Sequence, residues 1–189
     1  MRVIAGEAKG RRLVHPGGRE TRPATDRIRE TLFAILEPRL EGARVLDLFA
    51  GAGTLGIEAL SRGAKCATFV ERAAPALAAL RQNLETTGFA GRATVVPADV
   101  ARFADAPGGP YDLILCDPPF ADAGALRALL ARPALRAALA PGGQLVLRAH
   151  RKGAPDLAGI ARAVRERVLG EEVLRFLEYD AADADLVGG

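Results

Sequence analysis

The sequence is poor in cysteine and histidine. Only two cysteines, Cys66 and Cys116, occur in 189 residues, and each lies inside an apolar stretch. We therefore expect buried free thiols rather than a disulfide. The two histidines, His15 and His150, have no cysteine or histidine close by in the sequence with which to form a ligand set, so we expect no metal site.

Long apolar runs are also missing. No stretch of about 18 apolar residues is present, so we expect no membrane-spanning helix. The first residues, MRVIAGEAKGRR, lack the apolar core of a signal peptide, and we expect a cytoplasmic protein. The length and the hydrophobic content of 49% fit one soluble globular domain, which we expect to be a monomer.

Charge is distributed unevenly along the chain. Residues 1–39 contain nine basic and five acidic groups, a net charge of +4, whereas the whole chain carries +3, so the remaining residues sum to −1. A basic segment on a near-neutral body favours a phosphate-rich partner such as a nucleic acid. The alternative is a solvated arm, because nearly all of these basic residues are arginine.

From Arg44 onward, strand-like and helix-like segments alternate, which predicts a Rossmann-like, doubly wound and mostly parallel α/β sheet. Residues 164–168 and 173–179, separated by Gly170, predict an antiparallel C-terminal hairpin that completes a seven-stranded sheet. The other expected strands are 45–49, 67–70, 93–96, 111–116 and 144–148, and the expected helices cover 55–61, 75–88 and the leucines at 126–130.

The residues before this alternation form a small N-terminal extension. Residues 1–15 predict a strand pair with turns at Gly6 and Gly10, and Thr25 is a candidate N-cap for a helix that Pro38 ends. We therefore divide the chain into a basic extension (1–40), a core domain (41–180) and a flexible tail (181–189).

Residues 47–56, DLFAGAGTLG, contain a G-x-G-x-x-G pattern between a strand and a helix. Glu71 follows Gly51 by 20 residues, at the end of the next strand. This spacing matches the dinucleotide-binding fingerprint, in which glycines let the backbone approach the ligand and the acidic residue contacts a ribose diol. NAD and S-adenosyl-L-methionine are the two candidate ligands.

The sign of the nearby charge favours S-adenosyl-L-methionine. Asp47 precedes the glycine loop and Glu58 lies in the following helix. Carboxylates repel a pyrophosphate, by roughly 4 kcal/mol for unit charges about 4 Å apart, whereas the ammonium and sulfonium groups of S-adenosyl-L-methionine are positive. Asp99, after the third strand, is a candidate contact for the adenine amine or the N-cap of residues 100–104.

Residues 113–120, LILCDPPF, end an apolar strand in a carboxylate, two prolines and an aromatic ring. The carboxyl end of this strand faces the crevice where doubly wound sheets bind ligands. The carboxylate of Asp117 and the carbonyl of Pro118 can accept both hydrogens of a nucleobase amine. Pro118 and Pro119 stiffen the loop or merely end the strand, and Phe120 offers a face for base stacking.

These blocks resemble a known family. DPPF together with the glycine loop is similar to class I S-adenosylmethionine-dependent amino-group methyltransferases. The stretches RVIAGEAKGRRL (2–13), RPATDRIRETLFAIL (22–36), LDLFAGAGTLGIEALSRGA (46–64) and DPPF (117–120) resemble the bacterial 16S rRNA guanine-N2 methyltransferase family. The resemblance covers most of the chain and is looser at 164–179.

The resemblance implies methyl transfer from S-adenosyl-L-methionine to the N2 amine of one guanine in 16S rRNA, presented within a 30S assembly particle. It implies that residues 41–180 form the methyltransferase domain. Some relatives carry Asn-Ala where this chain has Ala98-Asp99, which bears on the adenine contact. The implied cofactor residues are Asp47, Phe49, Gly51, Gly53, Glu71 and Asp99, the implied catalytic residues are Asp117, Pro118, Pro119 and Phe120, and the candidate RNA contacts are Arg2, Lys9, Arg11, Arg12, Arg22, Arg27 and Arg29.

Three alternatives stay open. The first is a methyltransferase that acts on a DNA adenine or another nucleobase amine. The lack of a separate target-recognition domain argues against sequence-specific recognition of DNA. The second is an NAD-dependent oxidoreductase. The third is a nucleic-acid-binding module with a vestigial cofactor fold.

Overall fold

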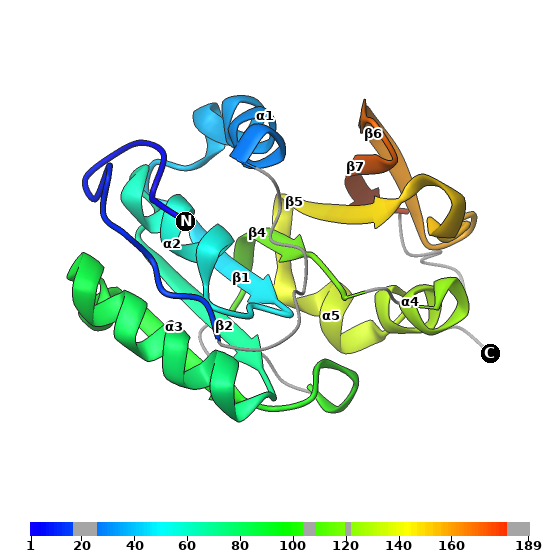
Figure 1. Cartoon of the computed structure of the whole chain (residues 1–189). Helices are drawn as coiled ribbons and strands as arrows, with labels where there is room; N and C mark the ends of the chain where they lie inside the picture. Colours follow the sequence, from blue (N-terminus) through cyan, green and yellow to red (C-terminus); the bar gives the residue numbers. More distant parts are fainter. Residues whose placement is uncertain (17–25, 104–108, 120–121, 181–189) are drawn as a thin grey trace.

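The structure is a computed structural model that describes residues 1–16, 26–103, 109–119 and 122–180 (Figure 1). At its centre is a seven-stranded sheet with the order β3-β2-β1-β4-β5-β7-β6. The first five strands in chain order pair in parallel, and β7 pairs antiparallel with both β5 and β6. The strands are β1 (Arg44–Leu48), β2 (Cys66–Glu71), β3 (Ala93–Pro97), β4 (Tyr111–Cys116), β5 (Leu139–His150), β6 (Ala161–Leu169) and β7 (Glu172–Tyr179). The predicted doubly wound sheet with a C-terminal hairpin is confirmed.

Helices cover both faces of the sheet because the strand residues alternate between two apolar cores. Val45 and Leu113 pack on one face with residues of α1, α2 and α3, while Leu46 and Ile114 pack on the other with α4 and α5. The described helices are α1 (Asp26–Leu36), α2 (Thr54–Ser61), α3 (Ala74–Thr87), α4 (Ala123–Leu130) and α5 (Pro133–Ala138), with 3-10 turns η1 (Glu37–Arg39), η2 (Ala90–Arg92), η3 (Val100–Arg102) and η4 (Arg151–Gly153).

The fifth strand begins earlier than predicted. The sequence predicts a turn at Pro141-Gly142-Gly143 followed by a strand at 144–148, whereas β5 already pairs at Leu139. Its register against β4 jumps between Tyr111↔Leu139 and Leu113↔Gln144, so the proline and glycines lie in an irregularity within the strand. Helix α5, which Pro133 begins, was not predicted.

Residues 1–16, which we call the N-terminal arm, form the predicted antiparallel strand pair only as one bridge, between Arg2 and Arg12. Two backbone hydrogen bonds of 3.0 Å flank this bridge. The backbone N–H groups of Ile4 and Ala5 instead donate to the buried Glu58 carboxylate of α2, at 2.8 and 3.0 Å. These side-chain acceptors satisfy amides that a strand ladder would otherwise use.

A buried amide fastens the far end of the N-terminal arm to the core. The side chain of Asn83 in α3 accepts from the N–H of Val14 at 2.8 Å and donates to the Val14 carbonyl at 3.0 Å. The same side chain also donates to the Ala52 carbonyl in the glycine loop at 2.9 Å. Asn83 therefore joins the arm, helix α3 and the glycine loop (Figure 1, dark blue and green segments).

Helix α1 packs as the sequence predicts, and Ile28, Leu32 and Leu36 are buried along one face. The predicted N-cap, Thr25, lies outside the described residues. Pro38 lies in η1, which extends the chain by one tighter turn past the end of α1. Both cysteines are free thiols, as expected, but only Cys116 is buried, whereas Cys66 is partly exposed. Within the described ranges, every helix is too short or too polar to cross a bilayer.

We predict that Asn83→Ala lowers the free energy of unfolding by about 2–4 kcal/mol, because it removes partners from backbone groups of Val14 and Ala52. Amide hydrogen exchange should accelerate first at Val14. The matched control is Thr86→Ala, since the Thr86 hydroxyl donates only to the Gln82 carbonyl within the same helix. Equal protection of Val14 in both variants would contradict the proposed anchoring.

Candidate active site

A cavity of about 440 Å³ lies at the carboxyl ends of the parallel strands, which is large enough for a nucleoside-sized ligand. The glycine loop, the ends of β2, β4 and β5 and the start of β7 border it. Its lining includes Met1, His15, Phe49, Gly51, Glu71, Asp99, Asp117, Pro118, Pro119, Asp122, Arg148, His150 and Glu172. Met1 and His15 belong to the N-terminal arm, so the arm reaches the cavity.

The glycine loop turns sharply between β1 and α2, and two of its glycines are required by their surroundings. Gly53 has a φ of +81°, and a Cβ atom there would lie 2.3 Å from a methyl group of Leu80. A Cβ atom on Gly56 would lie 2.3 Å from the ring of Phe69 in β2. The loop backbone can therefore approach α3 and the sheet only without these side chains.

The carboxylate of Asp47 lies behind the loop, not in the cavity. Asp47 is buried and accepts the N–H of Gly56 at 2.8 Å, in the first turn of α2. Burial raises the pKa of Asp47 from 3.8 to about 7, the Gly56 hydrogen bond opposes this rise, and the charges of Asp117 and Glu71 add to it. Asp47 thus supports the loop instead of lining the cavity.

Glu71 lies at the end of β2 and faces the cavity with its carboxylate already positioned. One oxygen accepts the N–H of Gly51 at 2.9 Å, and the other accepts the N–H groups of Arg72 and Ala73 at 2.8 and 2.7 Å. Three backbone donors use three of the roughly four acceptor sites of the carboxylate, so about one site remains, on the oxygen that contacts Gly51. This geometry suits one hydroxyl of a ribose diol.

Asp99 lies at the same end of the cavity, after β3. One carboxylate oxygen caps η3 by accepting the N–H of Ala101 at 2.8 Å, and the other pairs with Arg72 at 2.6 Å. These two contacts lower the pKa of Asp99. The capping alternative from the sequence is therefore observed, and the residue also lines the cavity.

Asp117 occupies the other end of the cavity, where β4 leaves the sheet. Both of its carboxylate oxygens lie 3.0–3.1 Å from Nη1 of Arg148, near the end of β5. Nε of Arg148 lies 3.5 Å from the carboxylate of Glu172, the first residue of β7. Burial raises the pKa of Asp117, Arg148 opposes the rise, and Glu172 adds to it.

Sequence reasoning did not identify Arg148 or Glu172 as site residues. An arginine that ends an apolar strand next to the DPPF strand was an available signal. Glu172 was not recognisable, because it begins its strand instead of ending one. Since β7 is antiparallel to β5, with His150 opposite Glu172, the start of β7 lies at the cavity edge of the sheet.

Most of the predicted ligand residues meet at the cavity. Phe49, Gly51, Glu71, Asp99, Asp117, Pro118 and Pro119 line it, whereas Asp47 and Gly53 lie behind the loop. Phe120 lies outside the described residues.

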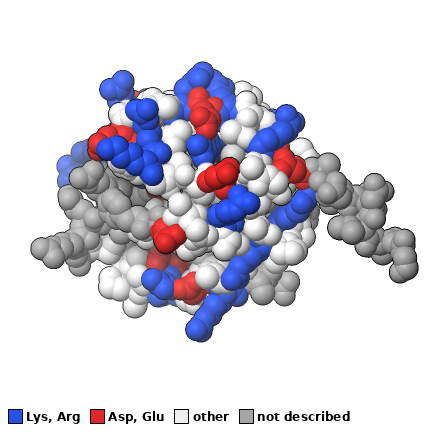
Figure 2. Space-filling model, turned by 90° about the vertical axis from the view of Figure 1, so that its right-hand side faces the viewer, with Lys and Arg blue, Asp and Glu red and all other residues white. Residues whose placement is uncertain are grey.

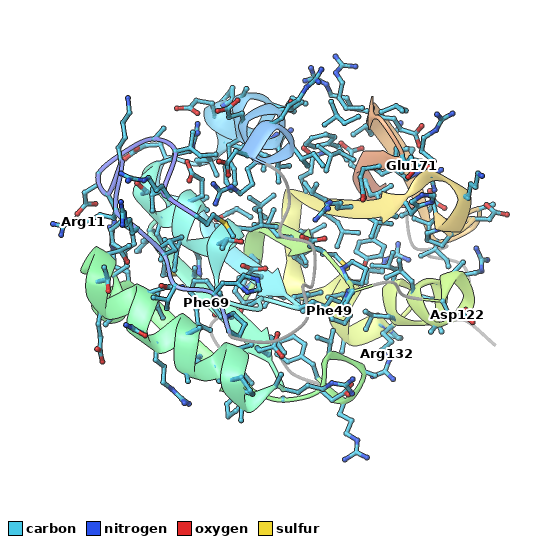
Figure 3. All side chains as sticks on the ribbon, viewed as in Figure 1. Arg11, Phe49, Phe69, Asp122, Arg132 and Glu171 are labelled. Atoms are coloured by element: carbon cyan, nitrogen blue, oxygen red, sulfur yellow. The ribbon has the colours of Figure 1, made fainter. Side chains whose placement is uncertain are left out.

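The candidate RNA contacts differ in exposure. Arg2, Lys9, Arg11, Arg12 and Arg27 are exposed, and Arg11 points away from the arm into solvent (Figure 3), while Arg22 lies outside the described residues.

Arg29 does not lie at the surface as a nucleic-acid contact requires. Its side chain is 0% exposed and donates to the Arg2 carbonyl and to Asp26, both at 2.8 Å. The helical pattern explains this position, because Arg29 follows Ile28 and precedes Leu32 on the buried side of α1. Arg29 joins α1 to the arm.

The side of the molecule that carries β6 and β7 has mixed charge. Figure 2 looks onto this side and shows basic and acidic side chains interspersed. Arg162 pairs with Glu178 at 2.8 Å, and Arg175 pairs with Glu166 at 2.7 Å. Such paired charges neutralise one another and make a weaker phosphate-binding surface than the exposed basic residues of the arm, which form no ion pair with the described acidic residues.

We predict that Asp47→Asn reduces the pH dependence of stability. Because the pKa of Asp47 is raised in the folded state, the folded chain keeps a proton on this carboxyl between about pH 4 and pH 7, whereas the unfolded chain releases it. The stability that this proton contributes is therefore lost as the pH rises through about 7. Urea unfolding across this range should give a slope that differs from wild type by up to about 1.4 kcal/mol per pH unit. Glu30→Gln, at an exposed position of α1, is the control and should leave the slope unchanged.

The comparisons with known proteins agree with this geometry. The family model described as "Conserved hypothetical protein 95" matches residues 1–178. The chain is 44% identical over 120 residues to ribosomal RNA small subunit methyltransferase D of Escherichia coli K12, an alignment that covers 64% of this chain and 60% of that protein. It is 39% identical over 123 residues to the protein of the same name from Haemophilus influenzae, with 64% of each chain covered. The chain thus aligns with less than two thirds of the length of these curated relatives.

A solved structure extends the match to nearly the full length. The Escherichia coli protein yhhF superposes with a TM-score of 0.82 and 34% identity, over 96% of this chain and 99% of that one. The family model and this superposition together confirm the resemblance found in the motifs: the chain belongs to the Conserved hypothetical protein 95 family, the class I methyltransferase family of the small-subunit rRNA enzymes.

Proposed function

We propose that this protein transfers the methyl group of S-adenosyl-L-methionine to the exocyclic N2 amine of a guanine in 16S ribosomal RNA. The observation that carries the proposal is the position of Asp117: the carboxylate of the DPPF segment lines the same cavity as Glu71 and the glycine loop. A nucleoside-binding end and an amine-binding end thus share one cavity, in a family whose curated relatives are small-subunit rRNA methyltransferases.

The charge of the cavity supports S-adenosyl-L-methionine over a dinucleotide. Among the described residues, the lining contains two arginines, Arg72 and Arg148, and each is paired with a carboxylate of the cavity. Asp47 already accepts the Gly56 N–H in the first turn of α2, which is the kind of donor that binds a pyrophosphate in dinucleotide folds. In the same described lining, five residues are acidic, namely Glu71, Asp99, Asp117, Asp122 and Glu172.

The residues present fit this cofactor. Glu71 would hold the ribose diol, Asp99 the adenine amine, and the loop at Phe49–Gly51 the methionine portion. When bound, S-adenosyl-L-methionine supplies an electrophilic methyl group. The anionic lining then favours its positive charge, in contrast to the repulsion that a pyrophosphate would meet.

Asp117 positions the amine that receives the methyl group. Its carboxylate accepts one N–H of the guanine amine and the Pro118 carbonyl accepts the other, which leaves the nitrogen lone pair facing the methyl donor. The amine loses one proton in the reaction, which Asp117 or water accepts. Because burial raises the pKa of Asp117, its carboxylate is a stronger base than one in water.

The N-terminal arm is the proposed RNA contact. Its basic side chains Arg2, Lys9, Arg11 and Arg12 are exposed, and its residues Met1 and His15 line the cavity. Phosphates held by the arm would therefore lie close to the entrance through which a base reaches Asp117. A target base must leave its stack, at a cost of a few kcal/mol, and phosphate contacts offset part of that cost.

We further infer that the RNA is presented within a 30S assembly particle and that the protein acts as a monomer. Tritium transfer should be measured on duplex DNA, naked rRNA and 30S particles from cells that lack the protein, followed by mass spectrometry of the rRNA. The proposal is supported if tritium is incorporated into 30S particles and if the rRNA of cells that lack the protein is missing one guanine methylation. Incorporation into DNA adenine supports the main alternative, and calorimetric binding of NAD would favour an oxidoreductase.

We predict that Asp117→Asn lowers kcat by about 10²–10³-fold, because a neutral amide stabilises the charge that develops on the amine less well. Cofactor affinity, measured by calorimetry, should change less than threefold (an expected bound of about 0.6 kcal/mol). Asp112→Asn is the matched control, since Asp112 lies on the same strand but is exposed. Near-normal turnover of Asp117→Asn would contradict the role given to this carboxylate.

We predict that Arg11→Ala combined with Arg12→Ala weakens RNA binding and flattens its salt dependence. Each lost phosphate contact should reduce the slope of log K against log[salt] by roughly 0.7–0.9. The control pair is Arg165→Ala with Arg167→Ala, which removes two exposed arginines from β6 on the mixed-charge side. An equal slope in both double variants would show that the arm does not bind phosphates.

A further inference from the structure

Two carboxylates meet at one end of the cavity, beside a single arginine. Asp117 lies 3.0 Å from Nη1 of Arg148, and Glu172 lies 3.5 Å from Nε of the same side chain. All three side chains are largely buried, with 11% of Arg148 and 24% of each carboxylate exposed, and all three line the cavity. The proposed function uses Asp117 alone, so the second carboxylate has no assigned role.

The position of Glu172 is electrostatically unfavourable without a partner. Two carboxylates near one another repel, and Arg148 carries a single positive charge between them. Oε2 of Glu172 lies 3.5 Å from Nε of Arg148, and within the described part of the chain Oε1 accepts no hydrogen bond. Glu172 therefore keeps acceptor capacity toward the cavity that a ligand donor can use.

The geometry of the pair matches one kind of nucleobase edge. Nε and Nη1 of an arginine are bonded to one carbon atom, and in guanine N1 and the N2 amine are likewise bonded to one carbon, C2. Both N1–H and N2–H of guanine are donors, so two adjacent acceptors suit them. In adenine and cytosine the ring nitrogen beside the amine carries a lone pair instead, which a carboxylate repels.

We propose that Glu172 is the residue that selects guanine, by accepting the N1–H of the base whose N2 amine Asp117 holds, with Arg148 positioning both carboxylates. This inference rests on the proposed function and adds the group that distinguishes guanine from other amine-bearing bases. The fold supplies this arrangement because the antiparallel β7 begins at the edge where β4 and β5 end.

The test uses 2-aminopurine, which keeps the amine at C2 but has an unprotonated N1. After mass spectrometry has located the methylated nucleotide, 30S particles are reconstituted with 16S rRNA that carries either guanine or 2-aminopurine there, introduced by splinted ligation. For the wild-type protein, kcat/KM should favour guanine by about 5- to 150-fold. For Glu172→Gln, whose amide can donate to N1, the preference should fall to threefold or less.

Glu171→Gln is the matched control. Glu171 is the neighbouring residue, its side chain is 78% exposed, and it projects from the turn between β6 and β7 (Figure 3). This variant should keep the wild-type preference. When the preference of a variant is divided by the wild-type preference, effects of 2-aminopurine that do not involve Glu172 cancel. Glu172→Ala should lower kcat/KM on guanine about tenfold or more and reduce the preference as well, while cofactor affinity stays within twofold.

The outcomes separate the two proposals. No methyl transfer to guanine particles by the wild-type protein would overturn the proposed function. Transfer to guanine with an unchanged preference in both Glu172→Gln and Glu172→Ala would overturn the role of Glu172 and leave the proposed function intact. Equal use of guanine and 2-aminopurine by the wild-type protein would also overturn it.

Discussion

The cavity depends on two hydrogen bonds that carboxylates at strand ends accept from the glycine loop. Asp47 of β1 accepts from Gly56, and Glu71 of β2 accepts from Gly51. Each bond joins a strand to the loop and occupies an N–H donor that a dinucleotide fold would leave for a phosphate. The same bonds that shape the loop therefore decide the sign of charge the cavity accepts. Asp99 and Asp117 line the same cavity as the glycine loop, whose position these two hydrogen bonds fix.

The antiparallel end of the sheet contributes as much to the site as its parallel part. Parallel strands bring only their carboxyl ends to the cavity, so chemistry there is limited to residues that follow a strand. Inserting β7 between β5 and β6 in the opposite direction brings the beginning of a strand to the same edge. Glu172 reaches Arg148 by this route, and Arg148 in turn contacts Asp117. A hairpin that looks like a simple extension of the sheet thus completes the end of the cavity that we propose to bind the amine.

Local patterns predicted the sheet, its helices and most of the cavity lining, because strand periodicity, glycine spacing and the DPPF segment each act over a few residues. Contacts between distant segments were not predictable. The sequence suggested that Asp47 faces the ligand, but a carboxylate in a buried strand is better satisfied by the Gly56 N–H. Arg29 was expected on the surface with its basic neighbours, yet the turn of α1 directs it inward. The strand pair of the arm is limited to one bridge because the Glu58 side chain of α2, whose position the local sequence does not reveal, accepts the N–H groups of Ile4 and Ala5.

The arm is attached to the core through its main chain and through the buried side chains of Val3, Ala8 and Leu13. Glu58, Ser61 and Asn83 bind the backbone of Ile4, Ala5, Ala8 and Val14, while the arginine and lysine side chains of the arm point outward. A segment held by its peptide groups can exchange its outward side chains without losing its place on the protein, since the attachment does not involve them. Evolution or an engineer could thus retune the affinity for a polyanion here residue by residue, leaving the catalytic scaffold untouched.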